Sequence, residues 1–163
     1  MKASLLHNEP ARLDVLHRYK ILDTPSEEAF DHLTRLATRT CRTPIALLNL
    51  IDSTRQWFKS NVGLDLSEMS RDIGLCPHAI LQREVFIVDD ASQDARFADD
   101  PMVTSYPHVR FYAGAPLISP EGHAIGTLCV IDRQPRKLRP EQAVALRFLA
   151  SRAIAQLELR RKI

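Results

Sequence analysis

The pattern of hydrophobic and polar positions predicts two helices in the first part of the chain. Residues 11–19 form a short amphipathic segment, and a longer one follows Pro25. Thr24 is a suitable N-cap, Pro25 suits the first helical position, and Glu27 is placed to close a capping box. The second helix carries apolar side chains at helical spacing, namely Phe30, Leu33, Ala37 and Cys41.

Five apolar runs with strand character come next. Residues 45–51 are almost entirely apolar, which is typical of a central strand covered on both faces. Residues 56–62 follow after a short turn, so the two runs predict an antiparallel hairpin. Residues 85–88 predict a short strand, and residues 109–118 and 124–131 predict a second hairpin.

The segments between these runs have weaker patterns. Residues 64–75 are expected to be irregular, and residues 77–82 predict a short helix with Cys76 at its N-terminal edge. Residues 89–107 are polar and long for a loop, and such loops often contain short helices. Residues 140–163 predict one long helix.

Together these elements predict an α+β fold, an α/β sandwich. Its centre is an antiparallel sheet of five or six strands with helices on both faces. We expect the terminal helices on one face and the 76–107 segment on the other, with a pocket beneath that segment.

Composition fits one globular domain. The chain has 163 residues, of which 45% are hydrophobic, enough for a sizeable core. The net charge of +2 is too small to indicate a nucleic-acid or membrane surface. We expect a single domain over residues 1–163, in which residues 1–25 form an N-terminal helix and lead-in and residues 140–163 a signalling and dimerisation helix.

The sequence also predicts a cytoplasmic location. Polar residues interrupt the first 13 positions, so no signal peptide is expected there, and no apolar run approaches the ~18 residues of a membrane span. The three cysteines are scattered without a C-x-x-C pair, which fits a reducing compartment and argues against a zinc site.

Six short motifs together resemble the GAF domains found at the N-terminus of bacterial sensor histidine kinases and diguanylate cyclases. They are LDTP at 22–25, QWFKS at 56–60, CPHAI at 76–80, DARF at 94–97, RFYAGAPL at 110–117 and GTLCVID at 126–132. The resemblance implies a sensory or regulatory domain of bacterial signal transduction that binds a small molecule and relays a signal through its terminal helices. It also implies a kinase or diguanylate cyclase as an output module.

The resemblance leaves two alternatives. One GAF branch reduces free methionine sulfoxide with pocket cysteines, and other members only dimerise without a ligand. Here Cys76 is the candidate nucleophile, while Cys41 on a helix and Cys129 on a strand are not evident resolving thiols. We therefore expect a domain that is not an enzyme.

Candidate ligand-binding residues lie in the 76–112 region. Arg110 and Tyr112 share one face of a strand, with Phe111 on the other. The predicted lining residues are Cys76, His78, Asp90, Phe97, Arg110 and Tyr112. Two alternatives remain open at this point: Cys76 as a packing residue, and Arg110 as the partner of a nearby acid.

Several ligand classes are not expected. Bilin-binding GAF domains attach the chromophore to a cysteine directly followed by histidine, whereas Pro77 separates Cys76 from His78 here. A covalent bilin is therefore not predicted. The Asn-Lys pair of cyclic-nucleotide GAF domains is absent, and the acidic residues at 89–100 lack the spacing of a calcium loop, so no metal site is predicted.

The last predicted helix indicates a homodimer. Its apolar stripe is broad enough to cover the sheet and consists of Leu146, Leu149, Ala150, Ala153, Ile154 and Leu157. Beyond it, Leu159 and Ile163 remain apolar past the expected sheet edge. A partner helix, with Leu13 and Leu16 of the first helix alongside, is expected to bury them.

Overall fold

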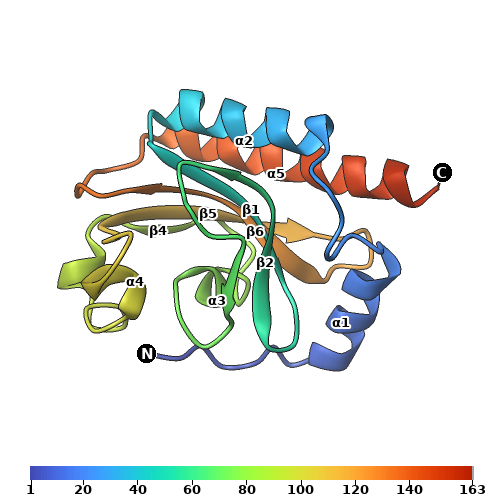
Figure 1. Cartoon of the computed structure of the whole chain (residues 1–163), viewed down its shortest axis with the longest axis horizontal. Coiled ribbons are helices and arrows are strands. Elements are labelled where there is room, and N and C mark those ends of the chain that lie inside the picture. The colour runs from blue at the N-terminus through green and yellow to red at the C-terminus, as the bar shows by residue number, and fades with distance from the viewer. Residues whose placement is uncertain (163) are drawn as a thin grey trace.

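The computed structural model describes residues 1–162 and contains one six-stranded antiparallel sheet (Figure 1). The strand order is β3-β2-β1-β6-β5-β4. The strands are β1 (Ile45–Ile51), β2 (Arg55–Val62), β3 (Glu68–Ser70), β4 (Phe86–Val88), β5 (Phe111–Ile118) and β6 (Ala124–Asp132). The helices are α1 (Glu9–Arg18), α2 (Glu28–Cys41), α3 (Cys76–Ala79), η1 (Ala91–Gln93, a 3-10 turn), α4 (Pro101–Thr104) and α5 (Pro140–Arg161).

The helices cover both faces of the sheet, which confirms the predicted α+β architecture. In Figure 1, α2 and α5 lie side by side on one face, and the short helices α3 and α4 lie on the other. The first helix, α1, packs against β6 and inserts Val15 and Leu16 into the core beneath α2 and α5. The two long helices are therefore separated from the 76–107 segment by the thickness of the sheet.

Strand alternation divides the apolar interior into two cores, one on each face of the sheet. In β5, Phe111 belongs to the core beneath α2 and α5, whereas Tyr112 belongs to the core beneath α3 and α4. All seven residues of β1 are buried, as expected for a central strand covered on both faces. The predicted opposition of Phe111 and Tyr112 is confirmed.

The start of α2 differs from the sequence prediction. The helix begins at Glu28, so Thr24 and Pro25 precede it and no capping box forms. The Thr24 hydroxyl donates to the carbonyl of Ile21 and accepts from Lys59 Nζ at 2.8 Å. Glu27 binds Lys59 instead of a backbone N–H, and this contact with a buried ammonium outweighs the local capping pattern.

Two further differences concern short elements. The segment expected to be irregular contains β3, which pairs with only three residues of β2. Arg110 lies just before β5 and not within it. At the C-terminus the structure describes α5 as far as Arg161, and the predicted contact of Ile163 lies outside the described residues.

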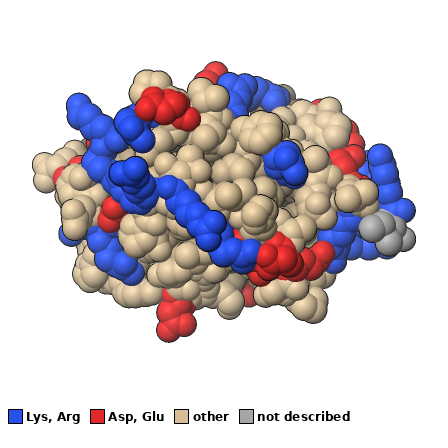
Figure 2. All heavy atoms as spheres, turned by 90° about the horizontal axis from the view of Figure 1, so that it is seen from above, with Lys and Arg blue, Asp and Glu red and all other residues tan. Residues whose placement is uncertain are grey.

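The face formed by α2 and α5 carries charges of both signs (Figure 2). Lys and Arg are interspersed with Asp and Glu, and uncharged surface lies between them. Across residues 1–162, no helix is both long and apolar enough to cross a membrane.

Candidate functional site

Four of the six predicted site residues come together on the sheet face opposite α2 and α5. Cys76, Phe97 and Tyr112 are buried there, and the half-buried His78 packs edge-on against Phe97 with ring centroids 4.8 Å apart. Phe86 of β4 lies between Phe97 and Tyr112, at 6.1 Å from each ring. Residues from α3, from β4 and the loop that follows it, and from β5 thus form one aromatic cluster beside Cys76.

The side chains of the other two predicted residues hold the backbone of the loop. The carboxylate of Asp90 accepts from Ser92 N at 3.0 Å and from Ser92 Oγ at 2.7 Å, which caps η1. The guanidinium of Arg110 donates to the carbonyl oxygens of Val103 and Val109 at 3.1 and 2.9 Å. Within residues 1–162 no acid pairs with Arg110, contrary to the alternative considered from the sequence.

Cys76 is surrounded by hydrogen-bond donors from two strands. Tyr112 Oη on β5 donates to the Cys76 sulfur at 3.0 Å, and Thr127 Oγ1 on β6 donates at 3.1 Å. The Sγ atom of Cys129, also on β6, lies 3.7 Å from that of Cys76. Strand alternation places Thr127 and Cys129 on the same face of the sheet, as the sequence predicts. Their contact with Cys76 of α3 is not predictable from sequence spacing.

These contacts shift the pKa values of Cys76 and Cys129 in opposite directions. Burial raises the pKa of Cys76, but hydrogen bonds from Cys129, Thr127, Tyr112 and Asn49 outweigh it and lower the pKa. Burial raises the pKa of Cys129 well above its ordinary value, and the neighbouring Cys76 adds to that rise. Of the two sulfurs, Cys76 is therefore the one that carries thiolate character.

Asn49 of β1 completes a buried polar cluster, which we define as Asn49, Cys76, Tyr112, Thr127 and Cys129. Its side-chain Nδ2 donates to Gln56 Oε1 at 2.9 Å, while its Oδ1 has no hydrogen-bond partner among the described residues. An unpaired buried acceptor costs about 1–3 kcal/mol. The cluster therefore offers an unused acceptor on the floor of a largely apolar core.

The position of the Tyr112 hydroxyl depends on a glycine two residues along β5. A Cβ atom at position 114 would overlap the Tyr112 hydroxyl and ring edge, so Gly114 leaves the space in which the phenol lies. This absence of a side chain aims Tyr112 along the strand and onto Cys76.

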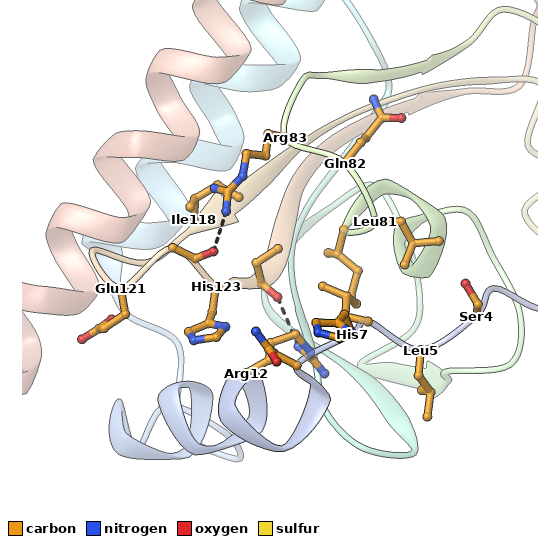
Figure 3. A pocket seen from close by; sticks show the side chains of 15 residues that line it. Ser4, Leu5, His7, Arg12, Leu81, Gln82, Arg83, Ile118, Glu121 and His123 are labelled. Carbon is orange, nitrogen blue, oxygen red and sulfur yellow. Dashed lines mark hydrogen bonds between the residues drawn. The ribbon is translucent and has the colours of Figure 1, made fainter.

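A separate cavity of about 710 Å³ lies beside the segment that follows α3, and none of the buried polar cluster's residues lines it (Figure 3). The N-terminal segment, the start of α1, residues 80–83 and the β5–β6 turn enclose it. His7, Arg12 and His123 face this space in Figure 3, and Arg83 Nη2 donates to the carbonyl of Gly122 at 2.9 Å. The sequence does not predict this cavity, because its walls come from segments far apart in the chain.

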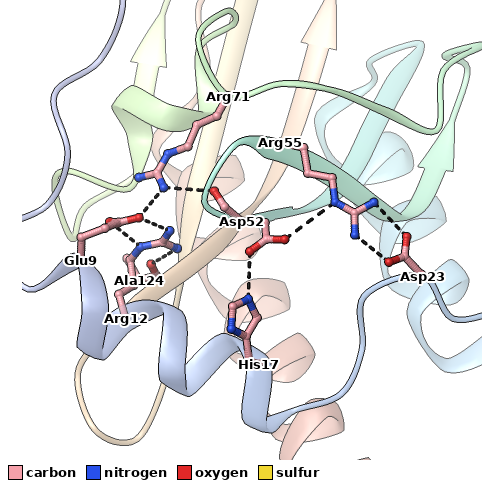
Figure 4. Close-up of polar contacts among 8 residues, drawn as sticks. All are labelled: Glu9, Arg12, His17, Asp23, Asp52, Arg55, Arg71 and Ala124. Atoms are coloured by element: carbon pink, nitrogen blue, oxygen red, sulfur yellow. Dashed lines mark hydrogen bonds and ion pairs between the residues drawn. The ribbon is translucent and has the colours of Figure 1, made fainter.

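Ion pairs fix α1 beside that cavity (Figure 4). Glu9 accepts from Arg12 at 2.8 and 3.0 Å and also from Arg71. Burial raises the pKa of Glu9, but the two arginines outweigh it and lower the pKa to about 2. His17 at the other end of α1 pairs with the Asp52 side chain at 2.9 Å, and Arg71 donates to the Asp52 carbonyl at 3.0 Å, so both ends of the helix are connected to the turn between β1 and β2.

Comparison with known families identifies the chain. The family model for the GAF domain matches residues 25–157. The chain belongs to the GAF family. Within residues 1–162, no group of three His, Cys, Asp or Glu side chains is placed to hold a metal ion.

One curated relative is similar to this GAF domain in sequence. It is a cyclic di-GMP phosphodiesterase of Pseudomonas aeruginosa, 44% identical over 140 residues. The alignment spans 86% of this chain but only 23% of the relative. This chain thus corresponds to about a quarter of that longer signalling protein, which supports a regulatory role in signalling.

Solved structures share the fold. The GAF domain of an Acinetobacter phosphoenolpyruvate-protein phosphotransferase has a TM-score of 0.67 at 18% identity, covering 97% of this chain and 98% of that one. Free methionine-R-sulfoxide reductase of Neisseria meningitidis has a TM-score of 0.68 at 16% identity, covering 98% and 97%. At these identities the similarity concerns the fold alone.

Proposed function

We propose that this GAF domain is the sensory part of a larger signalling protein. In this proposal a small molecule binds over the buried polar cluster, and its binding is relayed through the terminal helices to an output module such as a kinase, a diguanylate cyclase or a cyclic di-GMP phosphodiesterase. The domain itself carries out no catalysis. Membership of the GAF family and the similarity to the Pseudomonas phosphodiesterase support this role.

The observation that carries the proposal is the unpaired Oδ1 of Asn49 in a buried polar cluster. A ligand with an N–H or O–H group would supply the missing donor, and Phe97 and Tyr112 would contact its apolar part. Such a ligand is small and polar with one flat or apolar side.

The cover over the cluster suits ligand entry. It consists of α3 and α4, each of four residues, the three-residue η1 and their connecting loops. Short elements with few backbone hydrogen bonds open at lower free energy than the strands beneath them. A ligand would displace this cover, while the sheet remains as a rigid floor.

A path for the relay leads from the cluster through the sheet to α5. Tyr112 lies on β5, and α5 packs directly on β5. Near its end, Arg160 Nη1 donates to the carbonyl oxygens of Tyr19 and Lys20 at 3.3 and 3.2 Å. A shift of β5 would therefore move α5 together with the segment that connects α1 to α2.

We further propose that the domain forms a homodimer through α5. Val144, Phe148 and Leu159 are 70%, 58% and 56% exposed on one side of this helix, away from the sheet. A partner helix would bury them. Leu16, which the sequence predicts in the same contact, is fully buried inside the domain and is not available to a partner.

Native mass spectrometry of freshly purified protein, followed by thermal unfolding with a panel of small metabolites, tests ligand binding. We expect a retained or stabilising molecule whose effect is weakened in Tyr112→Phe, which removes the hydroxyl and keeps the ring. His123→Gln, in the separate cavity, is the matched control and should retain the effect. If only His123→Gln lost the stabilising effect, the ligand would bind in that cavity and not at the cluster. If no molecule bound at all, the result would favour a ligand-free dimerisation module.

A further inference from the structure

Two of the three cysteines lie next to each other although they are 53 residues apart in the chain. Cys76 opens α3 and Cys129 lies within β6, with 3.7 Å between their sulfur atoms. The third, Cys41, lies at the end of α2 in the core on the opposite face of the sheet. We propose that Cys76 and Cys129 form an oxidisable pair, which a hydroperoxide converts into a disulfide that joins α3 to the sheet.

The geometry requires only a small movement. A disulfide bond is about 2.05 Å long, so the two sulfurs must approach by less than about 2 Å. Cys129 is held in a central strand, whereas Cys76 stands on a four-residue helix in the cover over the sheet. The approach is therefore made by α3, with the sheet left in place.

The surroundings distinguish the roles of the two sulfurs. Two hydroxyl groups, Tyr112 Oη and Thr127 Oγ1, donate to Cys76 at 3.0 and 3.1 Å. Donors around a sulfur stabilise the thiolate, which is the reactive form towards peroxides. Cys129, whose pKa is raised by burial and by Cys76, remains a thiol. Cys76 is thus the attacking sulfur and Cys129 the resolving one.

The reaction balances with one hydroperoxide per pair. The Cys76 thiolate attacks the terminal oxygen of ROOH and the O–O bond breaks, which gives a sulfenic acid on Cys76 and an alkoxide that leaves as ROH after taking a proton. Cys129 then attacks the sulfenic sulfur. The S–O bond breaks, and the departing hydroxide takes the Cys129 proton to form water. The two thiols lose two electrons in total, and the peroxide gains them.

Burial of the two cysteines limits the rate of oxidation, and the disulfide then changes the contacts of α3. Cys76 is 4% exposed and Cys129 is fully buried, so oxidation requires opening of the cover and is slower than that of a free thiol. Once the bond forms, the Tyr112 and Thr127 hydroxyls lose a thiolate acceptor and α3 is covalently fixed to β6. The pair needs no other ligand, so this inference stands apart from the proposed small-molecule binding.

The test uses the full chain, reduced and then treated with hydrogen peroxide, alkylated, and analysed by peptide mass spectrometry. We expect a Cys76–Cys129 disulfide, an intact mass lower by two hydrogen atoms, and Cys41 recovered as a free thiol. Cys41→Ser is the matched control and should form the same bond. In Cys129→Ser, dimedone should trap a sulfenic acid on Cys76, and Tyr112→Phe should slow oxidation roughly fivefold because one thiolate donor is lost.

Peptide mapping of the wild-type chain decides the question even if a variant fails to fold. The proposal is overturned if Cys76 and Cys129 are both recovered as free thiols after peroxide treatment of the folded protein. It is also overturned if the oxidised species contains Cys41 or joins two chains. A ligand-binding result of either sign leaves these readouts unchanged, because the assay uses ligand-free protein.

Discussion

Arg160 Nε and Glu27 Oε2 form an ion pair of 2.8 Å between residues that are 133 positions apart. The same carboxylate oxygen accepts from Lys59 Nζ at 2.6 Å, and the Lys59 side chain is fully buried. Glu27 therefore connects the end of α5, the start of α2 and strand β2. It is the only carboxylate paired with the Lys59 ammonium within residues 1–162.

Replacing Glu27 should destabilise the domain more than replacing its neighbour. Glu27→Gln leaves the Lys59 ammonium without a counter-charge, and we expect a loss of about 1–2 kcal/mol, reduced from that of a fully buried pair because Glu27 is partly exposed. Glu28→Gln, which removes a surface pair with Arg35, is the control and should cost less than about 0.5 kcal/mol. Urea unfolding of both variants measures this, and equal losses would contradict a special role for Glu27.

Glu9 should make stability depend on acid pH. Its pKa is lowered from 4.5 to about 2 in the folded protein, so its contribution is complete above pH 4.5 and is lost as the pH falls through about 2. Glu9→Gln should therefore destabilise by roughly 2 kcal/mol at pH 7, and the difference from wild type should shrink between pH 4.5 and pH 2. Chemical unfolding at several pH values tests this, and a difference that does not change with pH would exclude it.

The exposed apolar residues of α5 predict how the domain assembles. We expect a dimer in analytical ultracentrifugation, and Phe148→Glu should convert it to a monomer because a carboxylate would be buried in the contact. Leu81→Glu changes an exposed leucine outside α5 and should remain dimeric. A wild-type chain that stays monomeric at high concentration would contradict the proposed dimer through α5.

A bilin chromophore should not attach to Cys76. The Cys76 sulfur faces Thr127 and Cys129 on β6, and Pro77 stands where bilin-binding relatives have a histidine. Co-expression with bilin-synthesis enzymes should give colourless protein whose absorbance matches that of Cys76→Ser. A coloured adduct that survives denaturation would contradict the prediction.

The domain is also expected not to turn over free methionine sulfoxide. Both sulfurs of the cysteine pair are buried among aromatic and hydroxyl side chains, so a substrate sulfoxide reaches Cys76 only when the cover opens, and we expect this to keep turnover below detection. A thioredoxin-coupled assay should show no consumption of reductant above that of Cys76→Ser. Sustained turnover that depends on Cys76 would assign the domain to the reductase branch.

The strands were predictable because burial on both faces leaves a strong pattern. The apolar run of β1 predicts a strand buried on both faces, and the alternation of Phe111 and Tyr112 predicts that they point to opposite faces of the sheet. The structure has both features. The predicted start of α2 was wrong because a capping pattern describes only local contacts, whereas Glu27 binds Lys59, which lies on β2.

The candidate site was predictable only in part. Phe97 and Tyr112 lie in motifs with a recognisable order, whereas Phe86 lies in none of these motifs. The proximity of Cys76 and Cys129 could not be predicted, because the two residues are 53 positions apart and meet only where α3 packs on β6. Asp90 and Arg110 look chemically available in the sequence. In the structure their polar groups bind the nearby backbone of the loop, and Asp90 also binds the Ser92 hydroxyl.

The space left by Gly114 links two positions of β5 through sterics. A larger residue at 114 requires a smaller one at 112, because the Tyr112 ring and a Cβ at 114 would occupy the same volume. We therefore expect the two positions to change together in homologous proteins. Relatives with alanine at 114 should lack the phenol, and their cysteine at 76 would lose one of its two hydroxyl donors.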